Sequence, residues 1–153
     1  MADTQPLVGL LAERAIHLAR TATDRDDAIR QCGQTLVSVG AVDPAYVEAM
    51  LERERSISTY VGEGVAIPHA TLAGKAAVRR DALAVLRFPD GVDWGGEQVI
   101  VCVAIAALGD GHVEILGELA QILLEPGRAQ ELREASQPAD VLRLLTPVGG
   151  DAA

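Results

Sequence analysis

The feature that most constrains the fold of this chain is the segment VIVCVAIAAL, residues 99–108, in which every side chain is apolar. A strand with one face in water alternates apolar and polar residues, whereas a strand covered on both faces is apolar throughout. The run is also far shorter than the ~20 apolar residues that a membrane-spanning helix needs. The sequence therefore predicts a buried strand over 97–108, in a sheet that helices cover on both sides.

Helices are predicted before and after this strand. One begins at Asp24, a favourable N-cap, and ends at Gly40; another begins at Asp43, with Pro44 at the first helical position, and ends at residue 56. The other expected elements are a strand over 81–88, a turn at 89–91, an amphipathic helix that His112 opens, and helices over 127–135 and 138–146. The order of these elements predicts an α/β fold.

Length, charge and cysteine content narrow the class of protein. The chain has 153 residues, the size of one ordinary domain, and a formal net charge of -9. Nucleic-acid-binding proteins present basic patches, so we expect no nucleic-acid partner, and the acidic balance suits a basic protein partner. Cys32 and Cys102 form neither a CxxC motif nor a metal-ligand spacing, and no signal peptide is visible. We therefore expect a reduced, cytoplasmic protein in which both cysteines are core thiols.

The segment GVAIPHA, residues 64–70, is the first candidate for chemistry. Pro68 favours an extended Ile67 and ends the strand, so His69 begins a loop whose backbone is partly fixed. Imidazole is a nucleophile near neutral pH when one ring nitrogen is unprotonated, and the N–P bond of a phosphorylated imidazole is reactive. On its own the motif fits a phosphoryl acceptor and a loop histidine without a role equally well.

Two further histidines complete the candidate set. His112 follows the buried strand and opens a helix, at a place where open α/β sheets bind ligands and where a helix N-terminus favours phosphate. The alternative is a buried histidine whose ring is hydrogen-bonded to the backbone. His17 lies in or beside a first strand, and we expect it to be structural. A zinc site built from the three histidines has no recognisable ligand spacing, so we do not expect one. Phosphoryl transfer to a histidine needs mainly positioning and electrostatics, so we expect neither a metal nor an organic cofactor.

Several segments together resemble the EIIA domain of the bacterial phosphoenolpyruvate-dependent sugar phosphotransferase system, in its mannitol/fructose class. They are GEGVAIPHA (62–70) within the longer block 46–69, FPDGVDW (88–94) and GHVEILGELAQILLE (111–125), and they are most like the mannitol branch. The resemblance implies one EIIA domain over residues 1–153, with a core at about 8–146 and a flexible tail at 147–153. It also implies a mixed, roughly five-stranded sheet flanked by helices on both faces.

The resemblance assigns roles to three residues. The phosphorylated histidine of the family matches His69, its second active-centre histidine matches His112, and its phosphate-contacting arginine matches Arg53, with Arg55 as the alternative. In the family the phosphocarrier HPr donates the phosphoryl group, and a cysteine of EIIB receives it and serves sugar uptake through the membrane component EIIC. The chain departs from the family at Ala70, where glycine is usual.

Two functions remain open on the sequence. The first is a phosphotransferase component that carries phosphate, as phosphohistidine, for the uptake of a sugar such as mannitol. The second is a regulatory phosphoprotein similar to the nitrogen-related EIIA branch, whose phosphorylation state sets its binding to another protein. Both use the same histidines, and the mannitol-like segments favour transport.

Overall fold

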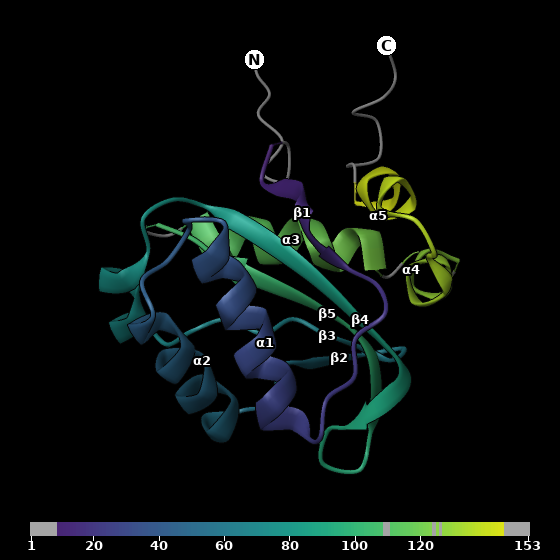
Figure 1. Cartoon of the computed structure of the whole chain (residues 1–153), viewed down its shortest axis with the longest axis horizontal. Helices are drawn as coiled ribbons and strands as arrows, with labels where there is room; N and C mark the ends of the chain where they lie inside the picture. Colours follow the sequence, from purple (N-terminus) through teal and green to yellow (C-terminus); the bar gives the residue numbers. More distant parts are fainter. Residues whose placement is uncertain (1–8, 109–110, 124, 126, 146–153) are drawn as a thin grey trace.

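Five strands form one mixed sheet in the order β1-β4-β5-β3-β2. A computed structural model describes residues 9–108, 111–123, 125 and 127–145 (Figure 1). Within it, β4 pairs with β5 and β2 with β3 in antiparallel fashion, whereas β1 runs parallel to β4 and β3 parallel to β5. The strands are β1 (Leu11–His17), β2 (Tyr60–Gly62), β3 (Val65–Ala66), β4 (Ala82–Asp93) and β5 (Gln98–Ala106).

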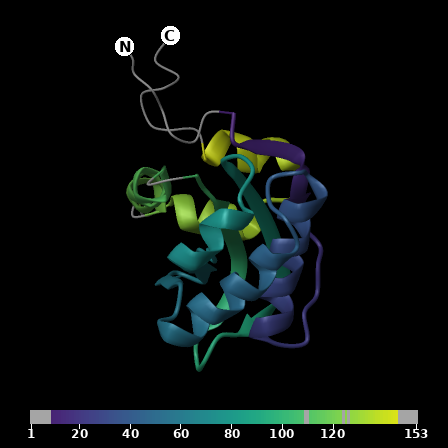
Figure 2. The ribbon, with the colours of Figure 1, turned by 90° about the vertical axis from the view of Figure 1, so that its left-hand side faces the viewer.

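Helices cover both faces of the sheet, as expected (Figures 1 and 2). On one face lie α1 (Arg25–Ser38) and α2 (Ala45–Ser56); on the other lie α3 (Gly111–Leu123), α4 (Arg128–Glu134) and α5 (Pro138–Leu144). The apolar run of β5 divides its side chains between two cores because successive residues of a strand point to opposite faces. Cys102, Ala104 and Ala106 pack towards α1 and α2, and Val101, Val103 and Ile105 pack towards α3, α4 and α5.

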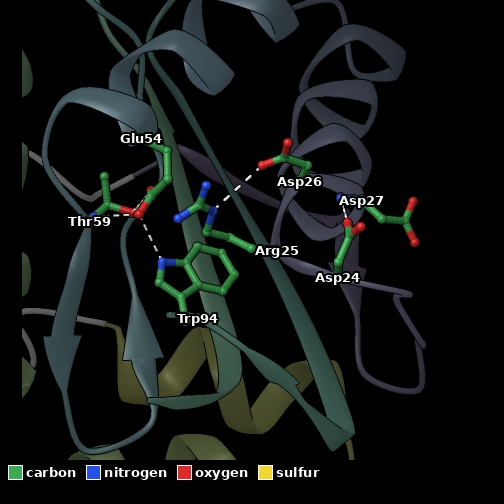
Figure 3. Close-up of polar contacts among 7 residues, drawn as sticks. All are labelled: Asp24, Arg25, Asp26, Asp27, Glu54, Thr59 and Trp94. Atoms are coloured by element: carbon green, nitrogen blue, oxygen red, sulfur yellow. Dashed lines mark hydrogen bonds and ion pairs between the residues drawn. The ribbon is translucent and has the colours of Figure 1, made fainter. Parts of the chain in front are cut away.

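The first helix begins as the sequence predicts, and the second does not. The Asp24 side chain accepts a hydrogen bond from the Asp27 backbone at 2.8 Å, which caps α1 (Figure 3). At α2, Pro44 occupies the N-cap position without a side-chain cap hydrogen bond. The Asp43 carboxylate instead accepts a hydrogen bond from Arg79 Nε at 2.6 Å. The expected Asp43 cap, with Pro44 at the first helical position, is therefore wrong: a distant arginine competes for this carboxylate.

The turn predicted at residues 89–91 is also wrong. β4 continues through this segment to Asp93, with an irregularity in its register against β5 between Arg87 and Val92. Gly91 has a φ of 82°, which glycine tolerates without strain, so the extra residues bend the strand rather than reverse it. The chain reverses later, where Trp94 N donates to Glu97 O at 2.7 Å.

The cysteines are part of the core. Cys32 on α1 and Cys102 on β5 are both free thiols with no exposed surface. Burial, and then the neighbouring Cys32 thiol, raise the pKa of Cys102 well above its usual value. The protonated Cys102 thiol is a poor nucleophile, and both buried cysteines pack as small apolar side chains. No helix in the part of the chain that the structure describes is long and apolar enough to cross a membrane.

Candidate functional site

A cavity of about 610 Å³ lies where the end of α2, the loop after β3 and the end of β5 meet. Arg53 lines it from α2, His69 from the loop, and Lys75 from the 3-10 helix η1 (Leu72–Ala77). The remaining lining residues are Tyr46, Ser56, Ala70, Thr71, Val78, Ile105, Ala107 and Leu116. The fold thus brings His69 and Arg53, two of the three predicted site residues, to one cavity.

The third predicted residue, His112, is placed by its backbone. It is the second residue of α3, and Leu116, one turn further along the same helix, lines the cavity. The His112 side chain and residues 109–110 lie outside what the structure describes. Its role in the site stays a prediction.

The two candidate arginines face different cavities. Arg53 lines the cavity that contains His69, and its Nη1 donates to the Ile57 carbonyl just past the end of α2. Arg55 lines a neighbouring cavity of about 470 Å³ together with the acidic residues Glu48 and Glu52. Residues two apart on a helix do not share a face, so only one of the pair can point towards His69. The structure thus favours Arg53 over Arg55 as the arginine of the site.

Backbone pairing fixes the start of the loop that holds His69. β3 pairs with β5, and beyond it Ile67 N donates to Thr59 O while Pro68 O accepts from Ile105 N, both at 2.9 Å. The His69 ring turns back over this segment, with Nδ1 at 2.9 Å from Ile67 O. A carbonyl oxygen can only accept, so this contact assigns the ring proton to Nδ1 and the lone pair to Nε2. Nε2 therefore carries the lone pair that a nucleophile would need.

Tyr46 ties this loop to the sheet. Its hydroxyl donates to Ile105 O at 2.7 Å, and its oxygen accepts from the backbone of Ala70, the residue after His69. Burial raises the pKa of Tyr46 to about 12, against the opposing effect of the Ala70 hydrogen bond. The phenol is therefore neutral at physiological pH and acts as a hydrogen-bonding bridge. Sequence reasoning gave Tyr46 no role in the site.

The alanine at position 70 fits because position 74 is glycine. A Cβ built at Gly74 would lie 2.9 Å from Ala70 Cβ and 2.8 Å from Ala49 Cβ, closer than real Cβ atoms approach. Gly74 thus leaves the space that the methyl group of Ala70 occupies. A side chain at position 74 would therefore clash with Ala70.

The electrostatic character of the cavity differs from that of the whole chain. The chain carries a net charge of -9. Among the described residues that line the cavity, however, there are two basic side chains, Arg53 and Lys75, and no Asp or Glu. The Thr71 hydroxyl, also in the lining, is buried without a hydrogen-bond partner among these residues. Two cations, a hydroxyl and an imidazole are the groups that bind and transfer a phosphoryl anion. The sequence analysis predicted neither Lys75 nor Thr71. For Lys75, the one signal in the sequence is that a cation lies close to the candidate nucleophile His69.

His17 takes no part in this cavity. It is the last residue of β1, and partial burial, then the Arg20 charge, lower its pKa. Within the described ranges, no group of three or more His, Cys, Asp or Glu side chains is placed to hold a metal ion.

Comparison with known proteins identifies the family. Residues 9–147 match the model of the phosphoenolpyruvate-dependent sugar phosphotransferase system, EIIA 2. The chain belongs to this EIIA family. It is 37% identical over 144 residues to a multiphosphoryl transfer protein of Xanthomonas campestris, covering 94% of this chain and 17% of that protein. It is 36% identical over 136 residues to the mannitol-specific phosphotransferase enzyme IIA component of Staphylococcus aureus, covering 89% of this chain and 94% of that one.

The EIIA fold is also confirmed by a solved structure. The complex of enzyme IIA mannitol and phosphorylated enzyme IIB mannitol from Escherichia coli matches with a TM-score of 0.81 and 34% identity. The match covers 88% of this chain and 94% of that one. This EIIA chain thus spans nearly the whole of the single-domain mannitol relatives, but less than a quarter of the Xanthomonas protein. The resemblance read from the sequence, to the mannitol/fructose class, is confirmed.

Proposed function

We propose that this chain is a cytoplasmic phosphoryl carrier that accepts phosphate from phospho-HPr on His69 and passes it to a cysteine of EIIB, for the uptake of mannitol. The observation that carries the proposal is the geometry of His69. Its Nδ1 is hydrogen-bonded to Ile67 O, which leaves the lone pair of the ring on Nε2, and its cavity is also lined by Arg53 and Lys75. The two buried free thiols suit a reducing compartment.

The transfer needs no group beyond the two proteins. Nε2 of His69 attacks phosphorus in line and an N–P bond forms. The bond from phosphorus to its carrier atom on phospho-HPr breaks, and the electron pair of that bond returns to the carrier atom. In the second step a thiolate sulfur of EIIB attacks the same phosphorus, and the electron pair of the N–P bond returns to Nε2. The proton on Nδ1 stays in place throughout, held by Ile67 O.

The other residues of the site stabilise the charge on the transferring group. The guanidinium of Arg53 offers several N–H groups in a planar fork, and Lys75 adds a second cation. Loose phosphoryl-transfer transition states depend mainly on positioning and electrostatics, so these contacts supply the catalysis. His112, at the start of α3, is proposed to donate a further hydrogen bond to the phosphate, next to helix N–H groups that favour an anion.

The relatives support transport over regulation and name the partner. The Staphylococcus aureus relative is a mannitol-specific enzyme IIA component, and the Escherichia coli structure is a complex with phosphorylated enzyme IIB. We extend both properties to this chain and take residues 1–153 to act as one carrier domain, with the membrane component EIIC engaged only through EIIB.

One experiment tests the proposal directly. The purified chain is incubated with phosphoenolpyruvate, Enzyme I and HPr, and phosphate is located by mass spectrometry under neutral to alkaline conditions. We expect one acid-labile phosphate on the peptide that contains His69, its absence from His69→Ala, and its transfer to mannitol EIIB. Phosphate retained by His69→Ala would contradict the acceptor assignment. Phosphorylation without transfer to any candidate EIIB would instead favour the regulatory function.

A further inference from the structure

A buried carboxylate lies immediately behind the phosphate site. Glu54 follows Arg53 on α2, and adjacent helical residues point in different directions, so Arg53 faces the cavity while Glu54 enters the core. Glu54 is 3% exposed. Burying a carboxylate lowers the free energy of unfolding unless its oxygens accept hydrogen bonds. Its contacts therefore indicate what the residue is for.

Three donors converge on the Glu54 carboxylate from two other parts of the chain (Figure 3). Thr59 supplies two of them: its backbone N–H lies 2.9 Å from Oε2 and its hydroxyl 2.5 Å from Oε1. The third is Trp94 Nε1, which donates to Oε2 at 2.9 Å from just beyond β4. The carboxylate thus fixes residue 59 to the end of α2 and to the β4–β5 hairpin at the same time.

The segment that Glu54 fixes contacts Arg53 directly and reaches His69 through Ile67. At one end, Ile57 O accepts from Arg53 Nη1. At the other end, Thr59 O accepts from Ile67 N at 2.9 Å, and Ile67 O is the acceptor that orients His69 Nδ1. A continuous series of hydrogen bonds therefore runs from Glu54 through Thr59 and Ile67 to the His69 ring.

We propose that Glu54 is a positioning residue for phosphoryl transfer: by anchoring residues 57–59 it holds the Arg53 guanidinium at the cavity and keeps the His69 ring in the Nδ1–H form. The proposal rests on the proposed function of His69. It gives a reason for a polar side chain in the core that packing alone does not need, because both carboxyl oxygens of Glu54 accept hydrogen bonds there. Trp94, which is buried and distant in sequence, helps to hold the Glu54 side chain in place through its indole N–H.

The decisive variant is Glu54→Gln, which keeps the size of the side chain but removes the charge and turns one acceptor oxygen into a donor. The first measurement is ¹⁵N NMR of the His69 ring in the unphosphorylated protein. We expect one Nδ1–H tautomer in the parent chain and a mixture of tautomers in the variant. The second is the single-turnover rate of transfer from phosphorylated protein to EIIB, which we expect to fall about tenfold.

Matched controls separate positioning from general stability. Glu52→Gln makes the same chemical change at an exposed carboxylate of the same helix, and it should leave tautomer and rate unchanged. The indole N–H signal of Trp94, the only tryptophan, reports whether Glu54→Gln retains the folded contact. Should that variant not fold, Thr59→Val removes only the hydroxyl donor and is expected to shift the tautomer in the same direction.

The outcomes are distinct. A folded Glu54→Gln, or its substitute Thr59→Val, with the parent tautomer and the parent transfer rate would overturn the proposal. An equal effect of Glu52→Gln would overturn it too, because the effect would then be one of charge on α2. If the parent chain is not phosphorylated on His69, the proposed function fails, but the tautomer measurement still decides whether Glu54 orients the ring.

Discussion

Replacing Arg53 with lysine tests the catalytic geometry most directly. The Arg53 side chain has two roles in this geometry: Nη1 donates to Ile57 O, and the side chain lines the cavity that contains His69. A lysine ammonium keeps the charge but is a single point on a shorter side chain, so it cannot hold the Ile57 carbonyl and also present a fork to phosphate. The substitution therefore removes the planar fork and leaves the positive charge.

The size of the effect follows from the bonds that are lost. A hydrogen bond that involves a charged group contributes about 1.5–3 kcal/mol. If that contribution is made in the transition state, transfer slows by roughly 10- to 150-fold. The effect on folding is smaller, because the bond from Arg53 to Ile57 O is exposed to solvent and its net contribution to stability is about 0.5–1.5 kcal/mol. We thus expect a folded protein that is still phosphorylated on His69 and transfers slowly.

The assay is a rapid-quench measurement in which the phosphorylated variant is mixed with excess EIIB. Arg55→Lys is the matched control, since Arg55 lies on the same turn of α2 but lines the neighbouring cavity. A parent-like rate for Arg53→Lys together with a slowed Arg55→Lys would refute the assignment, and parent-like rates for both would show that no guanidinium fork is needed.

Three further substitutions test other parts of the structure. His112→Ala should accept phosphate but pass it to EIIB at least tenfold more slowly, and complete loss of acceptance in a folded protein would mean that His112 shares the acceptor role. Tyr46→Phe leaves Ile105 O without its donor, so we expect urea denaturation to show a loss of about 1–3 kcal/mol in the free energy of unfolding, and an unchanged midpoint would count against the bridge. The pKa of His17 is lowered in the native state, so the unfolded state binds more protons just below the ordinary value of ~6.5. Stability should therefore fall as pH drops through that window, and His17→Gln should flatten this part of the curve; an identical pH profile would show that His17 makes no contribution.

The parts of the fold that local sequence determines were predictable. Asp24 caps α1, and the unbroken apolar run of β5 indicated helices on both faces of the sheet, because capping and burial depend on residues close together in sequence. Residues 89–91 were misread as a turn because proline and glycine serve a bent strand as well as a reversal. Only the pairing with β5 distinguishes the two.

The candidate site was predictable where its residues form a motif. Pro-His after an apolar run led to His69, and the family resemblance led to Arg53, which the structure places in the same cavity. Nothing in the sequence around Glu54 reveals that Trp94, forty positions later, is its donor. Contacts of this kind are set by how the layers pack, which single-sequence patterns do not encode.

The order of the elements along the chain has a consequence for biosynthesis. The apolar face formed by Leu83, Val85, Val103 and Ile105 is covered by α3, α4 and α5, all of which follow β5 in sequence. Synthesis of residues 107–144 takes ~2–8 s at typical ribosomal rates, and during that interval the sheet emerges with this face uncovered and prone to aggregate. α5 packs against β1, so the nascent domain closes only when its last helix meets its first strand. A ribosome that stalls within this stretch would hold the chain with this apolar face uncovered.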